Sequence, residues 1–468
     1  MIRDLAVVGA GPAGMAAAVE AAALGLSVAV VDEQPEPGGQ VFRAVERAAP
    51  GDPVLGADAA VGAALVRAFR GCGADYRPAT TLWHLDPEEG VLSLSARGAT
   101  EEIAARRVLL ATGAQERPVP IPGWTLPGVM TAGAAQILLK AADAVPAGRT
   151  VLAGQGPLLW LLAVQLLRAG APPALVLETT PRGRIRAALR EGGARLLAGG
   201  GRGALARGLG LIAEARRAIP VRRVAAGLRA EGDVRVRCVA WDDGDGTADC
   251  DTLLLHEGVV PATHIPLALG LGHAWDAAGH AWRPQTDGFG ASTHPRVAVA
   301  GDGAGIGGWE AAAAGGRLAA LDAARRLGRL GAGEVARRSA PLLAARRRAL
   351  AIRPFLDRLY APPAWVLAPP GDTTIVCRCE EVMAGGVRAA ARLGATGPNQ
   401  AKAYLRCGMG PCQGRLCGAT VAALIAEVRG VPVEGVGPLR PRAPYKPLTV
   451  GELAAGPPDR PATVAPGS

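Results

Sequence analysis

Five of the eight cysteines lie near the C-terminus, at spacings that could hold an inorganic cofactor. Cys377 and Cys379 form a C-x-C pair, and Cys407 and Cys412 form a C-x4-C pair further along the chain. Four thiolates brought to one point fit a zinc ion or an iron–sulfur cluster. We expect these four to be the ligands, because Cys407 and Cys412 lie immediately before and at the start of a predicted helix. Cys417 falls inside that helix, so it is expected beside the metal site and remains the alternative ligand.

The residues around the second cysteine pair suit a negatively charged cluster. Pro411 is typical of the first turn of a helix, which would place Cys412 at the positive end of the helix dipole. Gly408 and Gly410 let backbone N–H groups approach the sulfur atoms. Such hydrogen bonds tune the reduction potential of an iron–sulfur cluster.

A glycine-rich turn near the N-terminus predicts a dinucleotide site. An apolar run leads into Gly9, Gly11 and Gly14, and a helix of small residues follows. In this pattern the first glycine allows a tight turn, the second lets the backbone approach a pyrophosphate, and the third lets the helix pack closely on the strand. Asp32 ends the next predicted strand, where a carboxylate can accept hydrogen bonds from ribose hydroxyls.

Two further motifs match the same kind of site. Ala111-Thr112-Gly113 ends a buried strand, and Gly301-Asp302 ends another. Together with the first turn, they resemble the two-dinucleotide-domain flavoproteins of the glutathione and thioredoxin reductase type. The resemblance implies FAD rather than NAD at the first site, with Asp302 at the ribityl chain and the next helix directed at the flavin or the pyrophosphate. The implied FAD contacts are Gly9, Gly11, Pro12, Ala13, Gly14, Asp32, Glu33, Gly39, Gln40, Ala111, Thr112, Gly113, Gly301 and Asp302.

A second glycine-rich turn begins at Gly154. Gly156 follows, but Leu159 stands where a third glycine is expected, and Glu178 ends the next predicted strand, where it could face a ribose. No basic pair follows Glu178 to bind a 2′-phosphate. Three interpretations stay open: an NAD(P)H site, a site for another adenine nucleotide without hydride transfer, and a turn kept for packing.

The other cysteines and histidines indicate no further reactive site. Cys72, Cys238 and Cys250 are isolated, whereas disulfide reductases of the resembled type carry a paired dithiol beside the flavin. The histidines lack the spacing of metal ligands. We therefore expect no catalytic residue in this chain, with the redox chemistry supplied by cofactors.

The cysteine-rich segment resembles the bacterioferritin-associated-ferredoxin type of [2Fe–2S] domain. The matching strings begin at Cys377-Arg-Cys379-Glu-Glu and at Arg406-Cys-Gly-Met-Gly-Pro-Cys. Combined with the flavin scaffold, the chain is similar over nearly its whole length to the large subunits of opine dehydrogenases, D-hydroxyproline dehydrogenases and hydrogen cyanide synthase. The resemblance favours a [2Fe–2S] cluster over zinc, because a flavin in the same chain gives the cluster an electron partner.

The same resemblance implies an electron-transfer subunit of a dehydrogenase that oxidises an amine or imino acid, such as an opine, D-hydroxyproline or glycine. In such complexes an amino-acid-oxidase-like flavoprotein subunit takes the hydride from the substrate, and a small ferredoxin-like subunit is a further expected partner. Electrons then pass toward a quinone or a carrier. One alternative is a stand-alone NAD(P)H-dependent acceptor reductase, against which Leu159 argues. Another is a scaffold that binds FAD for folding only.

The expected fold class is α/β, with two Rossmann-like dinucleotide-binding domains and a small C-terminal helical Fe–S domain. Residues 101–104 are expected to close a β-meander, and 107–110 to form a separate buried strand. The expected parts are a discontinuous FAD-binding domain (1–115 and 262–330), a second NAD(P)-like domain (116–261), a helical and Pro-rich linker (331–372), the [2Fe–2S] domain (373–430) and an extended Pro-rich tail (431–468).

The composition limits which classes of partner and which cellular compartment are expected. The chain has 468 residues, 49% of them hydrophobic, and a net charge of +10. Its arginines are scattered through predicted helices without a basic block interleaved with aromatics, which favours a solvated surface over a nucleic-acid partner. The most apolar stretch, 151–167, parses as strand, turn and helix rather than as a membrane span. We expect a cytoplasmic protein without a signal peptide, in contact with membranes only through its partners.

Overall fold

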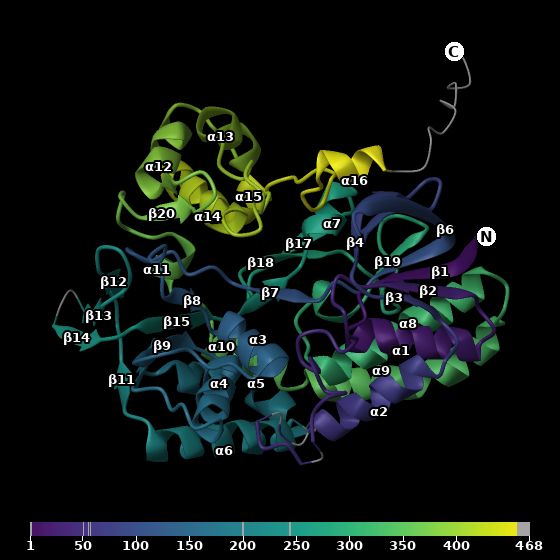
Figure 1. Ribbon diagram of the computed structural model, residues 1–468, viewed down its shortest axis with the longest axis horizontal. Helices are drawn as coiled ribbons and strands as arrows, with labels where there is room; N and C mark the ends of the chain where they lie inside the picture. Colours follow the sequence, from purple (N-terminus) through teal and green to yellow (C-terminus); the bar gives the residue numbers. More distant parts are fainter. Residues whose placement is uncertain are drawn as a thin grey trace.

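A computed structural model describes residues 2–49, 51–54, 56, 58–198, 201–242 and 245–455. Figure 1 shows two α/β domains side by side, with a small helical domain above the second of them. The predicted fold class is confirmed, because both larger domains are built on parallel sheets and the C-terminal domain is mostly helical. The domain limits given by the sequence stay predictions. Among the described residues, no helix is both long and apolar enough to cross a membrane.

The first domain contains a sheet in the order β3-β2-β1-β6-β5-β4, and β19 pairs with β6. β19 follows the second domain in the sequence. The first domain is therefore built from residues that precede the second domain and residues that follow it. The strands are β1 (Arg3–Val8), β2 (Val28–Val31), β3 (Asp75–Arg77), β4 (Thr80–Asp86), β5 (Val91–Ala96), β6 (Ala99–Leu110) and β19 (Val297–Val299). The expected separate strands at 101–104 and 107–110 are one strand, β6, which serves both the meander and the parallel sheet.

Two helices rich in small residues pack against this sheet and against each other. α1 (Pro12–Ala23) and α8 (Trp309–Arg326) approach so closely that a Cβ on Gly316 would collide with the carbonyl oxygen of Ala13. The core around them consists mainly of alanine, valine and leucine. α2 (Asp58–Arg70) packs beside α1.

The second domain is a five-stranded parallel sheet in the order β11-β10-β9-β15-β8. Its strands are β8 (Val129–Thr131), β9 (Thr150–Gln155), β10 (Leu175–Glu178), β11 (Val221–Arg223) and β15 (Thr252–Glu257). Its helices are α3 (Ala132–Ala142), α4 (Pro157–Arg168), α5 (Arg184–Ala198) and α6 (Arg202–Ala218). A small antiparallel sheet adds β12 (Arg229–Glu231), β13 (Cys238–Trp241) and β14 (Gly246–Asp249).

Two strands that pair antiparallel connect the larger domains, β7 (Ala114–Glu116) and β16 (Val259–Pro261). After β16 come α7 (His264–Ala268) and the hairpin of β17 (His273–Asp276) with β18 (Ala281–Pro284). η2 (Gly301–Gly303) follows β19. The paired strands β7 and β16, with α7 after them, are called the junction below. The dinucleotide turns of the two larger domains lie on either side of this junction.

The segment expected to be a linker is packed onto both domains. α9 (Ala332–Leu350) lies along α8 of the first domain, and α10 (Arg353–Leu359) lies on α5 of the second. α11 (Ala364–Leu367) then contributes Val366 to the core of the second domain. The segment is helical, as its composition indicates, and buried apolar side chains hold it against both domains.

The small domain holds the cysteines between a two-stranded sheet and a group of helices. Its elements are β20 (Ile375–Cys377), β21 (Val382–Met383), α12 (Ala384–Arg392), α13 (Pro398–Leu405), α14 (Gly418–Arg429) and α15 (Val433–Val436). The tail then runs back to the first domain and ends in α16 (Val450–Ala454), as Figure 1 shows. The predicted tail beyond residue 455 lies outside the described residues.

We predict that Gly316→Ala destabilises the protein by about 1–3 kcal/mol, because the added methyl group overpacks the contact between α1 and α8. The matched control is Gly210→Ala in the exposed middle of α6, where a Cβ meets nothing within 4 Å. That control should gain about 0.5–1 kcal/mol from helix propensity. Urea unfolding of both variants measures the difference, and equal stabilities would contradict the packing described for α1 and α8.

Candidate functional site

The first dinucleotide turn brings backbone segments so close that only glycine fits. Gly9 adopts a φ of 105°, and a Cβ there would collide with the carbonyl oxygen of Ala111. A Cβ on Gly14 would collide with the carbonyl oxygen of Gly9, and one on Gly39 would lie 2.9 Å from the Cα of Gly11. Three motifs that are distant in sequence therefore meet at the carboxyl ends of β1 and β6.

Asp32 follows β2 and holds this edge of the sheet together. Its Oδ1 accepts a hydrogen bond from the N–H of Gln34 at 2.7 Å, and its Oδ2 accepts one from the N–H of Ala10. Burial raises the pKa of Asp32, and these two donors oppose the rise. Carboxylate oxygens can accept more than one hydrogen bond, so Asp32 can still bind a ribose hydroxyl. Glu33, the other predicted acidic contact, pairs with Lys446 of the tail at 2.9 Å.

Asp302 lies in η2, between β19 and α8. Its Oδ1 accepts hydrogen bonds from the backbone N–H groups of Gly307 at 2.8 Å and Gly308 at 3.0 Å, which fixes the loop before α8. A Cβ on Gly303 would lie 3.3 Å from the carbonyl oxygen of Gly113. The segment that carries Asp302 is thus held against the turn that ends β6.

The structure gathers the predicted residues of this site along one edge of the first sheet. They lie in 9–14, 32–33, 39–40, 111–113 and 301–302. The glycines leave a cradle into which a pyrophosphate can approach the backbone, and the free N–H groups at the start of α1 face it. The residues present therefore fit a bound dinucleotide.

Four of the five C-terminal cysteines lie in or against one hydrophobic core: Cys377, Cys379, Cys407 and Cys417. Cys377 and Cys417 are the largest influence on each other's pKa: Cys417 lowers the pKa of Cys377 to about 6, and Cys377 raises the pKa of Cys417. Burial raises the pKa of Cys379, and the neighbouring Cys412 also influences it. Cys407 is buried, and this burial raises its pKa to about 11.

The helix after these cysteines begins later than predicted. Residues 411–417 form turns, and α14 starts at Gly418 with Cys417 as its N-cap residue. Gln413, with a φ of 49°, adopts a left-handed conformation that a right-handed helix excludes. The expectation that Cys412 starts the helix and that Cys417 lies inside it is wrong. Cys417 is the residue at the positive end of the helix dipole.

Thiols arranged as two pairs suit a two-iron cluster, in which four cysteines hold two iron atoms. Within the described ranges, no three His, Cys, Asp or Glu side chains converge as a single metal ion requires. The backbone N–H of Gly408 is among the groups that lower the pKa of the Cys377 thiol. A Cβ on Gly410 would collide with the Cβ of Cys379.

The loop after Cys412 is bound to the junction of the two larger domains. Gln115 on β7 donates from Nε2 to the carbonyl oxygen of Arg415 at 2.8 Å. His264, at the start of α7, forms a 2.7 Å hydrogen bond between its Nε2 and Oε1 of Gln413. Burial, reinforced by the nearby Arg415, lowers the pKa of His264 to about 4. Neutral His264 therefore donates this hydrogen bond at physiological pH.

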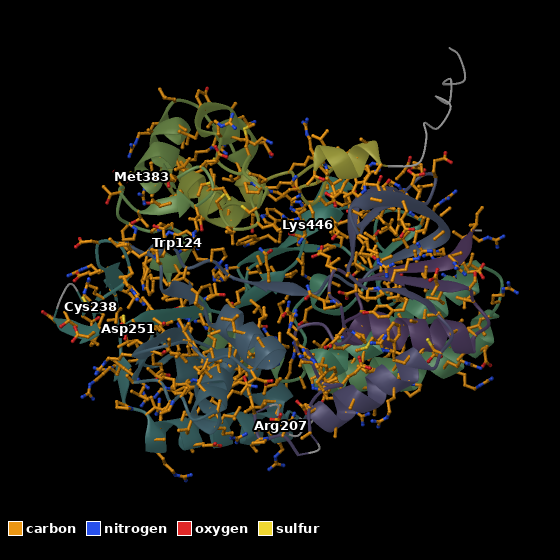
Figure 2. All side chains as sticks on the ribbon, in the orientation of Figure 1. Trp124, Arg207, Cys238, Asp251, Met383 and Lys446 are labelled. Atoms are coloured by element: carbon orange, nitrogen blue, oxygen red, sulfur yellow. The ribbon has the colours of Figure 1, made fainter. Side chains whose placement is uncertain are left out.

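The same junction reaches the dinucleotide turn. The N–H of Ala262 donates to the carbonyl oxygen of Gly113 at 3.0 Å, and His264 follows two residues later. Trp124 supports the small domain by donating from Nε1 to the carbonyl oxygen of Ile375 at 2.7 Å. Figure 2 shows Trp124 beneath this domain and Lys446 in the tail between it and the first domain.

These bridging residues were missed by the sequence analysis. Gln115, His264, Gln413 and Arg415 belong to no recognised spacing, and His264 looked like a structural histidine. They also line a cavity of about 100 Å³ between the small domain and the β17–β18 hairpin, together with Trp275. Only the folded chain reveals that they join the two predicted sites.

At the second glycine-rich turn, the side chains at the carboxyl ends of the strands are bonded to other groups of the protein. Gln155 ends β9 and is fully buried, and its Nε2 donates to Oε2 of Glu257 at 2.8 Å and to the carbonyl oxygen of Ala361 at 3.0 Å. Thr179 donates to the other oxygen of Glu257. Burial raises the pKa of Glu257 to about 7. Leu159, at the position expected for glycine, is part of the core between α4 and the sheet.

Glu178 has basic partners that the sequence did not indicate. Its Oε2 lies 2.9 Å from Nη2 of Arg216 and 3.6 Å from Nε of Arg223. Arg216 comes from α6 and also lies over the ring of Trp160. Arg216 and Arg223 are distant from Glu178 in the sequence and reach it only in the folded chain.

Comparison with known proteins agrees with the predicted fold and cofactors. Residues 3–328 match the family model described as pyridine nucleotide-disulphide oxidoreductase, and residues 375–427 match the model of the BFD-like [2Fe-2S] binding domain. Of the opine oxidase A subunits, that of Agrobacterium tumefaciens (strain Ach5) is 45% identical over 462 residues, which cover 96% of this chain and 91% of that protein. Hydrogen cyanide synthase subunit HcnB of Pseudomonas aeruginosa is 34% identical over 456 residues, which cover 94% of this chain and 96% of that protein.

Among solved structures, L-proline dehydrogenase from P. horikoshii matches with a TM-score of 0.70 at 19% sequence identity. The match covers 97% of this chain and 79% of that one. At this identity the match shows a shared fold alone. It extends over all three domains of the chain.

We predict that Glu257→Gln flattens the pH dependence of stability. Burial raises the pKa of Glu257 to about 7, above the ordinary value of 4.5 in the unfolded chain. As the pH rises, the unfolded chain therefore loses this proton at a lower pH than the folded protein does, and the folded state becomes less stable. Wild type should therefore lose at most about 3 kcal/mol as the pH rises from below 4.5 to above 7, and the variant should lack that loss. Urea unfolding from pH 5 to pH 8 measures it.

The matched control is Glu214→Gln on the half-exposed surface of α6, which should keep the wild-type pH dependence between pH 5 and pH 8. Parallel stability curves for wild type and Glu257→Gln would contradict the assignment of this proton.

Proposed function

Because the chain belongs to the family of the opine oxidase A subunits, we propose that it is the electron-transfer subunit of a heteromeric dehydrogenase that oxidises an amine or an imino acid. An opine, D-hydroxyproline and glycine are the candidate substrates. The chain binds FAD in its first domain and a [2Fe–2S] cluster in its C-terminal domain. In this proposal the substrate is oxidised in another subunit, which the names of the relatives as subunits support.

One observation carries this proposal. The hydrogen bonds from Gln115 to Arg415 and from His264 to Gln413 hold the cysteine loop against the junction that also contacts the Thr112–Gly113 turn. A cluster held there is next to the flavin site in a fixed orientation. An NAD(P)H-binding enzyme with an unrelated cysteine-rich appendage would not need such contacts.

The residues of the chain act by binding the cofactors and orienting them. Gly9, Gly11 and Gly14 admit the pyrophosphate to the start of α1, and Asp32 accepts hydrogen bonds from the ribose. Asp302 fixes the loop that leads into α8. When bound, FAD accepts two electrons and the cluster carries one at a time, so together they connect a two-electron donor to a one-electron acceptor.

We propose that the cluster ligands are Cys377, Cys379, Cys412 and Cys417. The predicted set had Cys407 in place of Cys417. The largest interactions between thiols, of Cys377 with Cys417 and of Cys379 with Cys412, support the exchange because they indicate that these side chains are neighbours. Cys417 also stands at the N-terminus of α14, where a negative charge is stabilised. Cys407 then lies beside the cluster as a buried neutral thiol.

Paired serine variants test this ligand set. Cys417→Ser should lower the iron content of the purified protein severalfold and abolish or shift the reduced-cluster EPR signal, because a thiolate ligand is lost. Cys407→Ser is the matched control and should keep the wild-type iron content and signal. The opposite outcome, loss in Cys407→Ser and retention in Cys417→Ser, would restore the set predicted from the sequence.

The expected partners are a small ferredoxin-like protein and a flavoprotein subunit of the amino-acid-oxidase type. The relatives are themselves named as subunits, which supports a multi-subunit assembly. Co-purification from cells that express the neighbouring genes identifies them.

Anaerobic spectroscopy of the purified chain tests the proposed function. Visible absorption should show a flavin, and dithionite should produce the low-temperature EPR signal of a reduced [2Fe–2S] cluster. Flavin with bound zinc and no EPR signal would remove the electron-transfer role. Flavin that no substrate reduces even in the assembled complex would favour a role for FAD in folding only.

A further inference from the structure

A segment of the chain itself crosses the edge of the second sheet where a nucleotide would bind. In open α/β sheets, ligands bind outside the carboxyl ends of the strands, at the point where the strand order reverses. Here that point lies between the neighbouring strands β9 and β15, whose last residues are Gln155 and Glu257. The segment 353–367, here named the strap, joins the two larger domains to the small domain and passes over this point.

The strap is bonded to the residues that would face a dinucleotide. The carbonyl oxygen of Ala361 accepts hydrogen bonds from Nε2 of Gln155 at 3.0 Å and from Nη1 of Arg184 at the start of α5. Gln155 is the residue between the two glycines of the turn, so Ala361 is bonded to the turn that a pyrophosphate would approach. Ala361 occupies the polar contact that such a ligand would make.

The adenosine side of this edge is also engaged. Tyr360 lies close enough to Glu178 and Arg216 for both charges to influence the pKa of its hydroxyl, which burial raises to about 12. Glu178, the expected ribose acceptor, is paired with Arg216 and Arg223. The side chains that end β9, β10 and β15 are therefore all bonded to protein.

The strap is anchored by packing as well as by hydrogen bonds. Phe355 is buried against α5, and a Cβ on Gly192 of that helix would collide with the backbone of Phe355. Val366 at the other end lies in the core of the second domain. The strap is held at both ends, and its middle residues Tyr360 and Ala361 lie across the nucleotide edge.

Beneath the strap the edge keeps polar atoms that a ligand could use. Oε1 of Gln155 and Oγ1 of Thr180 are buried without a hydrogen-bond partner in the described part of the chain. Buried polar atoms of this kind are uncommon and costly. The part of the edge beneath Ala361 is thus polar and covered by protein, whereas a cavity of about 370 Å³ lined by Glu178, Arg216 and Arg223 remains on the adenosine side.

We propose that the strap determines the electron-donor specificity of this subunit by standing in the place of a nicotinamide nucleotide in the second domain. NADH or NADPH can bind there only when the strap is displaced, so the flavin of the intact protein receives electrons from another donor. The apparent affinity for nucleotide falls in proportion to the fraction of molecules with the strap displaced. This inference rests on the fold of the second domain and extends the proposed function to the choice of donor.

Two variants and a control test the strap in the full-length, flavin-loaded protein. Phe355→Ala removes its anchor on α5, and Arg184→Ala removes one donor to Ala361. Phe69→Ala is the matched control, because Phe69 is similarly buried but lies on α2 of the first domain. Titration calorimetry with NADH and with NADPH measures binding, and stopped-flow absorption measures flavin reduction.

Wild type and Phe69→Ala should show no saturable binding at millimolar nucleotide and no rapid flavin reduction. Phe355→Ala should bind nucleotide at least ten-fold more tightly, and Arg184→Ala should shift affinity in the same direction. Tight binding to wild type would overturn the proposal. So would variants that retain FAD but bind no better than wild type. If Phe355→Ala fails to fold, Arg184→Ala decides alone.

The test is separable from that of the proposed function. Reduction of the cluster by dithionite does not involve the second domain, so the EPR signal should be the same in wild type, Phe355→Ala and Arg184→Ala. A normal EPR signal with tight NADH binding to wild type would refute the strap and leave the electron-transfer role intact.

Discussion

The hydrogen bond from Gln115 to the carbonyl oxygen of Arg415 fixes the position of the cysteine loop relative to the two larger domains. Gln115 lies in β7, one of the paired strands that connect the larger domains, and Arg415 lies in the loop between the last cysteines. The bond between His264 and Gln413 supports the same contact from α7. Together these two bonds fix the cysteine loop, whereas Trp124 holds the small domain at a different place.

This constraint explains why the small domain is placed where it is. Electron transfer depends on a fixed and short separation between carriers, and a domain on a free linker would not provide it. The chain instead packs its linker onto α5 and α8 and returns its tail to the first domain, where Lys446 pairs with Glu33. These contacts lie in three different places, so together they fix the orientation as well as the position of the cysteine domain.

Much of the fold and of the flavin site could be predicted from the sequence, because each depends on local backbone geometry. Gly9, Gly14 and Gly39 are required by close approaches that a side chain would block, so their spacing is visible in the sequence itself. The cysteine pairing could not be predicted in the same way. It depends on turns at Gln413 and Gly414 that delay the start of α14, and these turns override the helical signal of Pro411.

Contacts between distant segments escaped prediction for a different reason. Arg216 and Arg223 reach Glu178 from a helix and a strand that no local pattern connects to it, and Ala361 contacts Gln155 through a backbone carbonyl that carries no side-chain signal. The sequence left three interpretations of the second turn open. None of the three included a segment of the chain that lies over the turn. The proposed arrangement shares features with two of them, because the turn contributes to packing and the edge of the sheet keeps the form of a nucleotide site.

The central claim is that the cysteine loop is held rigidly beside the flavin site by the domain junction. Pulsed EPR on the half-reduced protein, which measures the separation between the flavin radical and the reduced cluster, tests it most directly. A single narrow distance in wild type that broadens in Gln115→Ala is the predicted result. A broad distribution in wild type, unchanged by Gln115→Ala, would contradict the account.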